Sequence, residues 1–300
     1  MTEKGKKTIY PCRLPSVTRI LGMAKYIAFQ GAPGAYSDLA CKAAAPDCTT
    51  LPCLSFEDVF AAVHEGRAEL AMLPIENSVA GRVADMHRLL PEGGLHIIAE
   101  HYQPVVHHLL ALPGAKLENI RQAHAHIQSL AQCRRWLRER GILPVVNVDN
   151  AMAAEFVAGS GDKTIAAIAS SLAGELYGLQ SLAEDIADKS NNTTRFLIMA
   201  KKPVIPDPGT GACVTTLVFR VRSVPAALYK ALGGFATNGI NITKLESYLV
   251  DGKFTAAQFY IDVEGHPEEQ KLKNALEELA FFAHEIKILG TYPAHKFRTG

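Results

Sequence analysis

The stretch NNTTRFLIMAKKPVIPDPGTGA, residues 191–212, divides the chain into two parts that differ in their hydrophobic pattern. Its first half places two amides, two hydroxyls and a guanidinium directly before the apolar run 196–200, which is typical of a buried strand. Its second half has three prolines and two glycines, which indicates a linker over 201–212. Turn chemistry would explain the two asparagines, but it does not require the threonines and the arginine that follow.

Before the linker, short apolar runs alternate with helical patterns. One helix is expected to follow Ser55, whose hydroxyl can pair with Asp58 in a capping box, and to end at Gly66. A second helix over 130–137 has one apolar face. This alternation predicts an α/β domain with a mostly parallel sheet. The expected strands are YIAFQ (26–30), ELAMLPI (69–75), LHIIAEH (95–101), PVVHHLLAL (104–112), PVVNV (144–148), TIAAIAS (164–170) and RFLIMA (195–200).

After the linker the order of elements changes. Helices are expected to open at Pro225 and at Pro267, and a tight turn is expected at Asp251-Gly252. The expected strands are TTLVFRVR (215–222), INITKLESYLV (240–250), TAAQFYIDV (255–263) and HEIKILGTYP (284–293). The resulting βαββαβ order predicts a ferredoxin-like unit.

Composition excludes several classes of protein. The chain of 300 residues is long enough for two domains, and 48% hydrophobic with 20% charged residues is typical of a soluble globular protein. A formal net charge of +1 argues against a nucleic-acid binder. No apolar run approaches the ~18 residues of a membrane span. The six cysteines form no CxxC pair and no zinc spacing, which suits a reducing cytoplasm. We expect residues 1–22 to be a disordered extension, because they lack the apolar core of a secretory signal.

Three loops of the first domain carry more polar groups than turns need. They are GAPGAYSD (31–38) with Ser37, LPIENSVAGRVAD (73–85) with Asn77 and Ser78, and HAHIQSLAQC (124–133) with His126 and Gln128. The first two come at the ends of predicted strands, and His126 and Gln128 are expected at another strand end and helix start; ligands of α/β proteins bind at such strand ends. The alternative is that these residues only cap helices or stabilise turns. The loops contain neither a metal cluster nor a nucleophile–histidine–acid set, so we expect hydrogen bonding and electrostatics around an anionic substrate.

The chain resembles the prephenate dehydratase family over about residues 25–295. The resemblance rests on motifs that occur in the same order as in the family: GAPGAYS, PIENSVAG, LAQC, YGL and NNTTRF, followed by GGFATNGINITKLES. The resemblance implies a two-lobed catalytic region like that of periplasmic binding proteins over 23–200, with lobe one at about 25–101 and 192–200 and lobe two at about 102–191. It also implies an ACT-type domain over 213–295 that binds phenylalanine, and a homodimer or homotetramer.

The resemblance implies a role for each matched residue. Thr194 is the expected catalytic residue, a hydrogen-bond donor to the leaving ring hydroxyl of prephenate. Arg195 is expected to bind a substrate carboxylate, with an interlobe ion pair as the alternative. Phe196 is expected to pack against the substrate ring or to join the core. The other expected substrate-binding residues are Ser37, Asn77, Ser78, His126 and Gln128. No metal or organic cofactor is expected, because aromatisation of the ring drives the reaction.

The chain departs from the family pattern at several positions. The family's His-Pro-Gln is His126-Ile127-Gln128, and Asn150 stands where threonine is usual. Ala226-Ala227-Leu228 replaces Gly-Ala-Leu, and Glu246-Ser247-Tyr248 replaces Glu-Ser-Arg. The last two changes add a methyl group and remove a cation in the regulatory unit. The expected effector-binding residues are Ala226, Leu228, Asn238, Asn241, Ile242, Glu246 and Ser247.

Two further functions compete with this one. Arogenate, with an amino group in place of the keto group of prephenate, is the alternative substrate, and no residue of the sequence decides between them. A ligand-binding module without turnover is the alternative class, although the intact Thr194-Arg195-Phe196 run argues against it.

Overall fold

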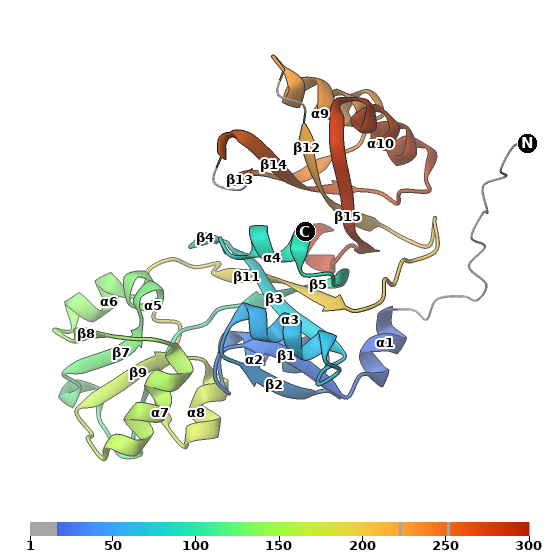
Figure 1. The fold of residues 1–300 in the computed structure, drawn as a ribbon. Helices are drawn as coiled ribbons and strands as arrows, with labels where there is room; N and C mark the ends of the chain where they lie inside the picture. The colour runs from blue at the N-terminus through green and yellow to red at the C-terminus, as the bar shows by residue number, and fades with distance from the viewer. Residues whose placement is uncertain (1–16, 222–223, 251–252, 300) are drawn as a thin grey trace, which may run out of the picture.

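The computed structural model describes residues 17–221, 224–250 and 253–299, which are arranged around three sheets (Figure 1). The first sheet has the order β2-β1-β3-β11-β5, with β4 paired to β3. Its elements, with the helices α2 to α4 that pack on it, are β1 (Tyr26–Gln30), α2 (Tyr36–Ala44), β2 (Thr49–Cys53), α3 (Phe56–His64), β3 (Leu70–Asn77), β4 (Gly81–Arg82), α4 (Met86–Glu92), β5 (His96–Pro104) and β11 (Thr193–Ala200).

The second sheet has the order β10-β6-β9-β7-β8. The chain enters it after β5 and returns to the first sheet at β11, so two crossing segments join two lobes. Its elements are β6 (His108–Ala111), η1 (Leu117–Asn119), β7 (Gln122–His126), α5 (Ile127–Gln132), α6 (Arg134–Glu139), β8 (Leu143–Asn147), α7 (Asn150–Ser160), β9 (Ile165–Ala169), α8 (Ser171–Tyr177) and β10 (Gln180–Ala183).

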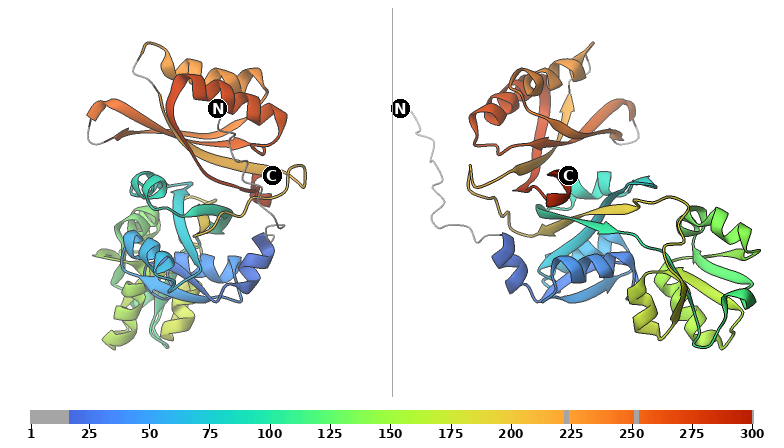
Figure 2. Two further views of the ribbon diagram at one scale, coloured as in Figure 1. Left: turned by 45° about the vertical axis from the view of Figure 1, so that its right-hand side comes forward. Right: turned by 180° about the vertical axis from the view of Figure 1, so that it is seen from behind.

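The third sheet, of order β13-β14-β12-β15, confirms the predicted βαββαβ unit. The helices of this unit cover the face of its sheet that is turned away from lobe one (Figure 2). Because successive side chains of a strand point to opposite faces, Leu217 and Phe219 pack in the core under these helices. Val218 instead shares a core with Leu197 and Met199 of lobe one. The elements are β12 (Cys213–Val221), α9 (Ala227–Thr237), β13 (Ile242–Val250), β14 (Lys253–Glu264), α10 (Gln270–Phe282), β15 (Ala283–Pro293) and η2 (Lys296–Thr299).

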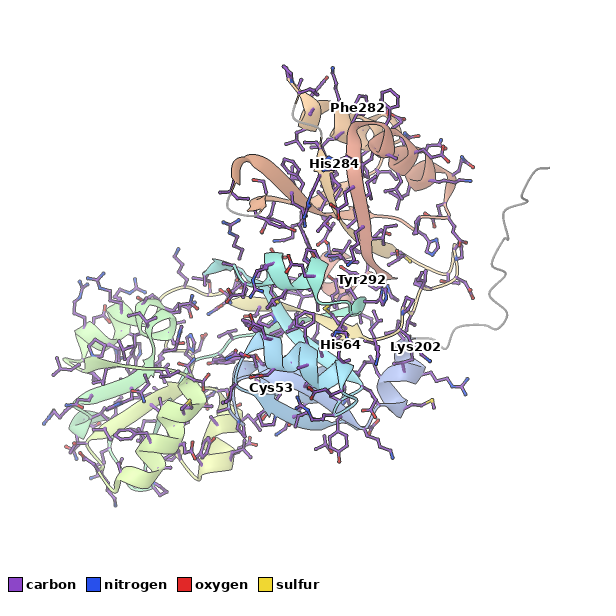
Figure 3. The ribbon with its side chains drawn as sticks, viewed as in Figure 1. Cys53, His64, Lys202, Phe282, His284 and Tyr292 are labelled. Atoms are coloured by element: carbon purple, nitrogen blue, oxygen red, sulfur yellow. The ribbon has the colours of Figure 1, made fainter. Side chains whose placement is uncertain are left out.

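The ferredoxin-like unit contacts lobe one closely where β15 meets β5. A Cβ added at Gly290 would lie 2.1 Å from the backbone oxygen of Ile97, so only glycine fits between these strands. Tyr292, two residues further along β15, is fully buried at the same boundary (Figure 3).

The expected extension is wrong for its last residues. Val17–Met23 form helix α1, which packs Val17, Ile20 and Leu21 against the core of lobe one. These three residues stand at positions i, i+3 and i+4, which lie on one face of a helix, so the sequence already contains this signal. Residues 1–16 and the expected turn at 251–252 lie outside the described residues.

Side-chain caps begin several of the helices, among them α3, α7 and α8. Ser55 and Asp58 form the predicted capping box of α3. The helix expected over 130–137 is instead two short helices that meet at Cys133, although its apolar face is buried as predicted. Strand β2 is not among the expected strands; it contains Pro52, which its place at the sheet edge tolerates.

Candidate active site

A cleft of about 570 Å³ lies between the two lobes, beside the segments that cross between them. Lobe one contributes the start of α2, the end of β3 and the start of β11, and lobe two contributes the end of β7 and the start of α5. The predicted site residues that line the cleft are Ser37, Asn77, His126, Gln128, Thr194 and Phe196. The structure therefore gathers side chains that lie more than 150 residues apart in the sequence.

Thr194 and Asn77 are hydrogen-bonded in a defined direction. The side-chain oxygen Oδ1 of Asn77 accepts hydrogen bonds from the backbone N–H groups of Val79 and Ala80, at 2.9 and 2.7 Å. This fixes the orientation of the amide, whose nitrogen donates to Thr194 Oγ1 at 2.9 Å. Since Thr194 Oγ1 is the acceptor in this bond, its own hydrogen can be donated into the cleft.

The hydrogen bonds of Asn77 continue from lobe one into lobe two. The Asn77 nitrogen also donates to Asn192 Oδ1 at 2.7 Å, and the Asn192 nitrogen donates to Gln132 Oε1 at 3.0 Å. His107 Nε2 lies 2.7 Å from that oxygen and must therefore carry a hydrogen. Its Nδ1 faces the Tyr36 hydroxyl at 2.8 Å, which also lies 2.9 Å from the Val106 carbonyl oxygen.

His107 and Tyr36, at one end of this series of hydrogen bonds, keep their protons in place. Burial lowers the pKa of His107, against the opposing effect of its bond to Gln132, so the ring favours its neutral form. Burial also raises the pKa of the Tyr36 hydroxyl, which stays protonated. No role was predicted from the sequence for Tyr36, His107, Gln132 or Asn192, although the first and the last two lie inside the motifs GAPGAYS, LAQC and NNTTRF.

The remaining polar residues hold a loop and a helix start in place around the cleft. Ser78 does not line it; its hydroxyl donates to the Asn191 carbonyl at 2.8 Å and accepts from Thr193 N–H at 2.9 Å, which closes its loop against β11. His126 caps α5 by accepting from Gln128 N–H at 3.3 Å. Asn150 accepts from His126 N–H at 2.9 Å and donates to Ser129 at 2.8 Å. The unusual asparagine thus holds the start of α5 in place.

Arg195 does not lie in the cleft, contrary to the expectation for it. Its side chain is 3% exposed on the opposite face of the first sheet, because consecutive strand residues point to opposite sides. The guanidinium donates to Glu100 at 2.8 Å, to Glu76 at 3.0 Å and to Asp262 at 2.6 Å. It also donates to the Tyr292 hydroxyl at 3.0 Å. The expected alternative, an ion pair between the lobes, is also wrong, since two of the carboxylates, Glu76 and Glu100, lie in lobe one and the third, Asp262, lies in the ferredoxin-like unit.

Comparison with known sequences decides the relationship of the chain. The sequence model of the prephenate dehydratase family matches residues 27–204. The chain belongs to the prephenate dehydratase family.

Relatives of this family cover nearly the whole chain. A Komagataeibacter europaeus protein named bifunctional N-acyl-homoserine lactone acylase/prephenate dehydratase is 55% identical over 91% of this chain and 98% of its own length. The Arabidopsis thaliana arogenate dehydratase/prephenate dehydratase 1 is 43% identical over 89% of this chain and 71% of its own. A crystal structure of prephenate dehydratase from Arthrobacter aurescens in complex with L-Phe has a TM-score of 0.82, 32% identity and 90% coverage of both chains.

The residues expected to bind the effector lie at the two ends of α9, in the turn that follows it and along β13. Ala226 has a φ of 60°, a left-handed conformation that favours glycine. Asn238 donates to the Gly234 carbonyl and to Glu278, and Glu246 pairs with Lys244. Leu228 and Ile242 pack against the core of the unit, while Asn241 and Ser247 are exposed. In the single chain these side chains serve the fold of the unit, and β13 lies at an edge of its sheet.

Metal binding and membrane insertion find no support in the part of the chain that the structure describes. No group of three or more His, Cys, Asp or Glu side chains there is arranged to hold a metal ion. No helix among these residues is long and apolar enough to cross a membrane.

Proposed function

We propose that the protein catalyses the decarboxylative dehydration of prephenate to phenylpyruvate in the interlobe cleft, as a hydro-lyase of the phenylalanine pathway. The observation that carries this proposal is the direction of the Asn77–Thr194 hydrogen bond, which leaves the Thr194 hydrogen for the substrate. A fixed donor in the cleft is what departure of a ring hydroxyl requires.

The chemistry needs little beyond this donor. Loss of the ring carboxylate as CO₂ sends its bonding electrons into the ring, and the ring hydroxyl leaves opposite it and takes a proton to become water. Thr194 donates toward the departing oxygen, and the bond that Thr194 accepts from Asn77 polarises its O–H further. Phe196 is buried beneath the cleft and supports the ring that becomes aromatic.

Other groups in the cleft suit a dianionic substrate. Ser37 and Gln128 supply neutral donors from opposite lobes, and Arg82 of β4 adds a cation on the same wall as Asn77. Arg195 takes no part in this contact, since its donors are occupied on the other face of the sheet.

Arogenate is the second candidate substrate, because several relatives of 36–43% identity have arogenate dehydratase in their names. The deciding assay incubates the purified protein with prephenate and with arogenate separately and follows phenylpyruvate and phenylalanine. We expect phenylpyruvate from prephenate at the higher kcat/KM. Turnover of arogenate alone would replace the substrate assignment, and turnover of neither would overturn the proposal.

The acylase named for the Komagataeibacter europaeus relative is the less favoured activity. Acyl hydrolysis by a hydroxyl nucleophile needs a base within hydrogen-bond reach. Among the described residues that line the cleft, only Tyr36 places a hydroxyl beside an imidazole, and burial raises the pKa of that phenol. An N-acyl-homoserine lactone arm in the assay above is therefore expected to show no turnover.

We also propose that the ferredoxin-like unit is an ACT-type regulatory domain that binds phenylalanine at an interface between two copies of the chain, in a cytoplasmic homodimer or homotetramer. The Arthrobacter aurescens relative, a prephenate dehydratase crystallised in complex with L-Phe, supports an effector of this kind. The exposed edge strand β13 offers the interface. Calorimetric titration with phenylalanine, repeated on the chain ending near Lys202, tests it: the full chain should bind, and equal binding by the shorter chain would place the effector elsewhere.

A further inference from the structure

Two successive cross-strand pairs of the β3–β11 ladder face opposite sides of the first sheet. Thr194 lies opposite Asn77, and Arg195 lies opposite Glu76. The first pair is hydrogen-bonded in the cleft at 2.9 Å, and the second is ion-paired on the far side at 3.0 Å. Because each strand joins its two residues through one peptide bond, a shift of the far pair moves the cleft pair.

The backbone ladder is interrupted beside these pairs. The register shifts between Arg195 and Phe196, so that Phe196 lies opposite Pro74 and Ile75 has no partner on β11. A bulge of this kind disrupts the ladder locally and bends the strand. On its β3 side the cleft end of β11 is therefore held by side-chain contacts as well as by the ladder, while its pairing with β5 is regular over 193–198.

Two of the four side-chain partners of Arg195 come from the ferredoxin-like unit. Asp262 of β14, with a fully buried side chain, accepts from Arg195 at 2.6 Å and from Thr216 at 2.6 Å. Tyr292 of β15 accepts from Arg195 at 3.0 Å. A buried cation needs all of its partners, because the charge that remains after one is removed is not solvated.

A second link joins the same place to the strand expected to bind the effector. Lys244 of β13 donates to Glu76 at 2.6 Å and to Glu246 at 2.5 Å, and its side chain is 9% exposed. Glu76 thus pairs with Arg195 of its own lobe and with Lys244 of the ferredoxin-like unit, and it directly precedes Asn77 in the chain.

We propose that the ferredoxin-like unit positions Thr194 for catalysis through Arg195 and Asp262, which are positioning residues of the reaction proposed above. When the two units are docked, the Arg195 network holds the end of β11 so that Thr194 meets Asn77. Loosening the network on one face of the sheet misplaces the donor on the other. The inference rests on the proposed function for its kinetic readout.

The test compares Asp262→Asn, which removes the charge at nearly constant shape, with the wild-type full chain. Its kcat should fall at least about tenfold while KM changes less than about twofold, since a small misplacement of a catalytic group lowers rate more than binding. Tyr292→Phe, a milder change, should lower kcat in the same direction. Lys287→Gln is the matched control, because Lys287 also bridges the units, to the Pro91 carbonyl, but does not contact Arg195.

A double variant separates positioning from general destabilisation. If Asp262 acts through Thr194, then Asp262→Asn should have less than about a twofold effect on kcat in a Thr194→Ala background, since coupled residues are not additive. Multiplied losses in the double variant would overturn the proposal. So would kcat losses in Asp262→Asn and Tyr292→Phe no larger than that of Lys287→Gln.

Hydrogen exchange provides a readout that does not depend on turnover. In Asp262→Asn, amides in 76–78 and 193–195 should exchange faster, while those of β7 in lobe two stay unchanged. Unchanged exchange at 76–78 and 193–195 would overturn the positioning role even in an active enzyme. A wild-type protein that converts neither prephenate nor arogenate would overturn the proposed function, and exchange would still decide this inference.

Discussion

Thr194 and Asn77 each have one defined role in the hydrogen bond between them. Thr194 points its oxygen at the Asn77 amide and keeps its hydrogen for the cleft, and Asn77 is oriented by two backbone N–H groups. Such an arrangement is sensitive to single atoms, because replacing the amide nitrogen by oxygen reverses the direction of the bond to Thr194.

Asn77→Asp makes that replacement at nearly constant shape. The carboxylate still accepts from Val79 and Ala80, but its second oxygen now accepts from Thr194, which diverts the hydroxyl hydrogen from the substrate. We expect kcat to fall by roughly 10²-fold, within the range for loss of a positioned proton donor. Steady-state kinetics with a thermal melt as folding control checks this, and wild-type kcat in the variant would contradict the assigned direction.

Ala226 tests a departure from the family pattern. Its left-handed backbone costs a residue with a Cβ about 1 kcal/mol, so Ala226→Gly should stabilise the protein by about that amount and raise the Tm by a few degrees. Ala236→Gly, on an exposed helical position of α9, should lower the Tm instead. Differential scanning calorimetry of both variants decides, and a lower Tm for Ala226→Gly would refute the strain argument.

At the scale of elements, the alternation of strands and helices and the βαββαβ order were predictable, because local patterns of apolar residues encode them. The cleft residues were predictable as strand-end loops with polar excess. Arg195 was not, because its partners come from four other strands of two sheets, and nothing local to NNTTRF shows where they meet. The strand period by itself places Arg195 on the face opposite Thr194, which the expectation of a substrate contact overlooked.

The contact between β15 and β5 is the element-level feature most open to test. Gly290→Ala places a Cβ against the Ile97 backbone, which cannot yield without separating the two strands. We expect a loss of stability of several kcal/mol, typical of overpacking against backbone, and faster proteolysis of the linker 201–212. Gly233→Ala, in an open position of α9, is the control that should be neutral or stabilising. Equal proteolysis of the two variants would argue against this docking.

At the scale of the whole molecule, docking of the two units depends on ionised carboxylates. Burial alone would raise the pKa values of Glu76 and Asp262, but Lys244 and Arg195 on Glu76, and Arg195 and Thr216 on Asp262, outweigh it and lower both. Unfolded carboxyls titrate at about 3.9–4.3. Their stabilisation is therefore complete above about pH 5 and is lost as the pH falls through the lower folded-state values.

Acid unfolding followed by circular dichroism should show this dependence. Glu76→Gln should lose stability at neutral pH and show a shallower fall of stability with decreasing pH below about 5, because one linked proton is absent. Glu57→Gln, which breaks an exposed ion pair to Arg88, is the control and should follow the wild type closely. Parallel pH curves for wild type and Glu76→Gln would contradict the linkage.

The most direct measurement of the central claim is the rate of phenylpyruvate formation from prephenate by wild type, Thr194→Ser and Thr194→Ala, each shown to be folded. The cleft geometry predicts that serine, which keeps the hydroxyl, retains most of kcat, whereas alanine loses roughly 10²–10⁴-fold with little change in KM. Wild-type turnover by a folded Thr194→Ala variant would contradict the account, because the hydroxyl that Asn77 orients would then have no part in the departure of water.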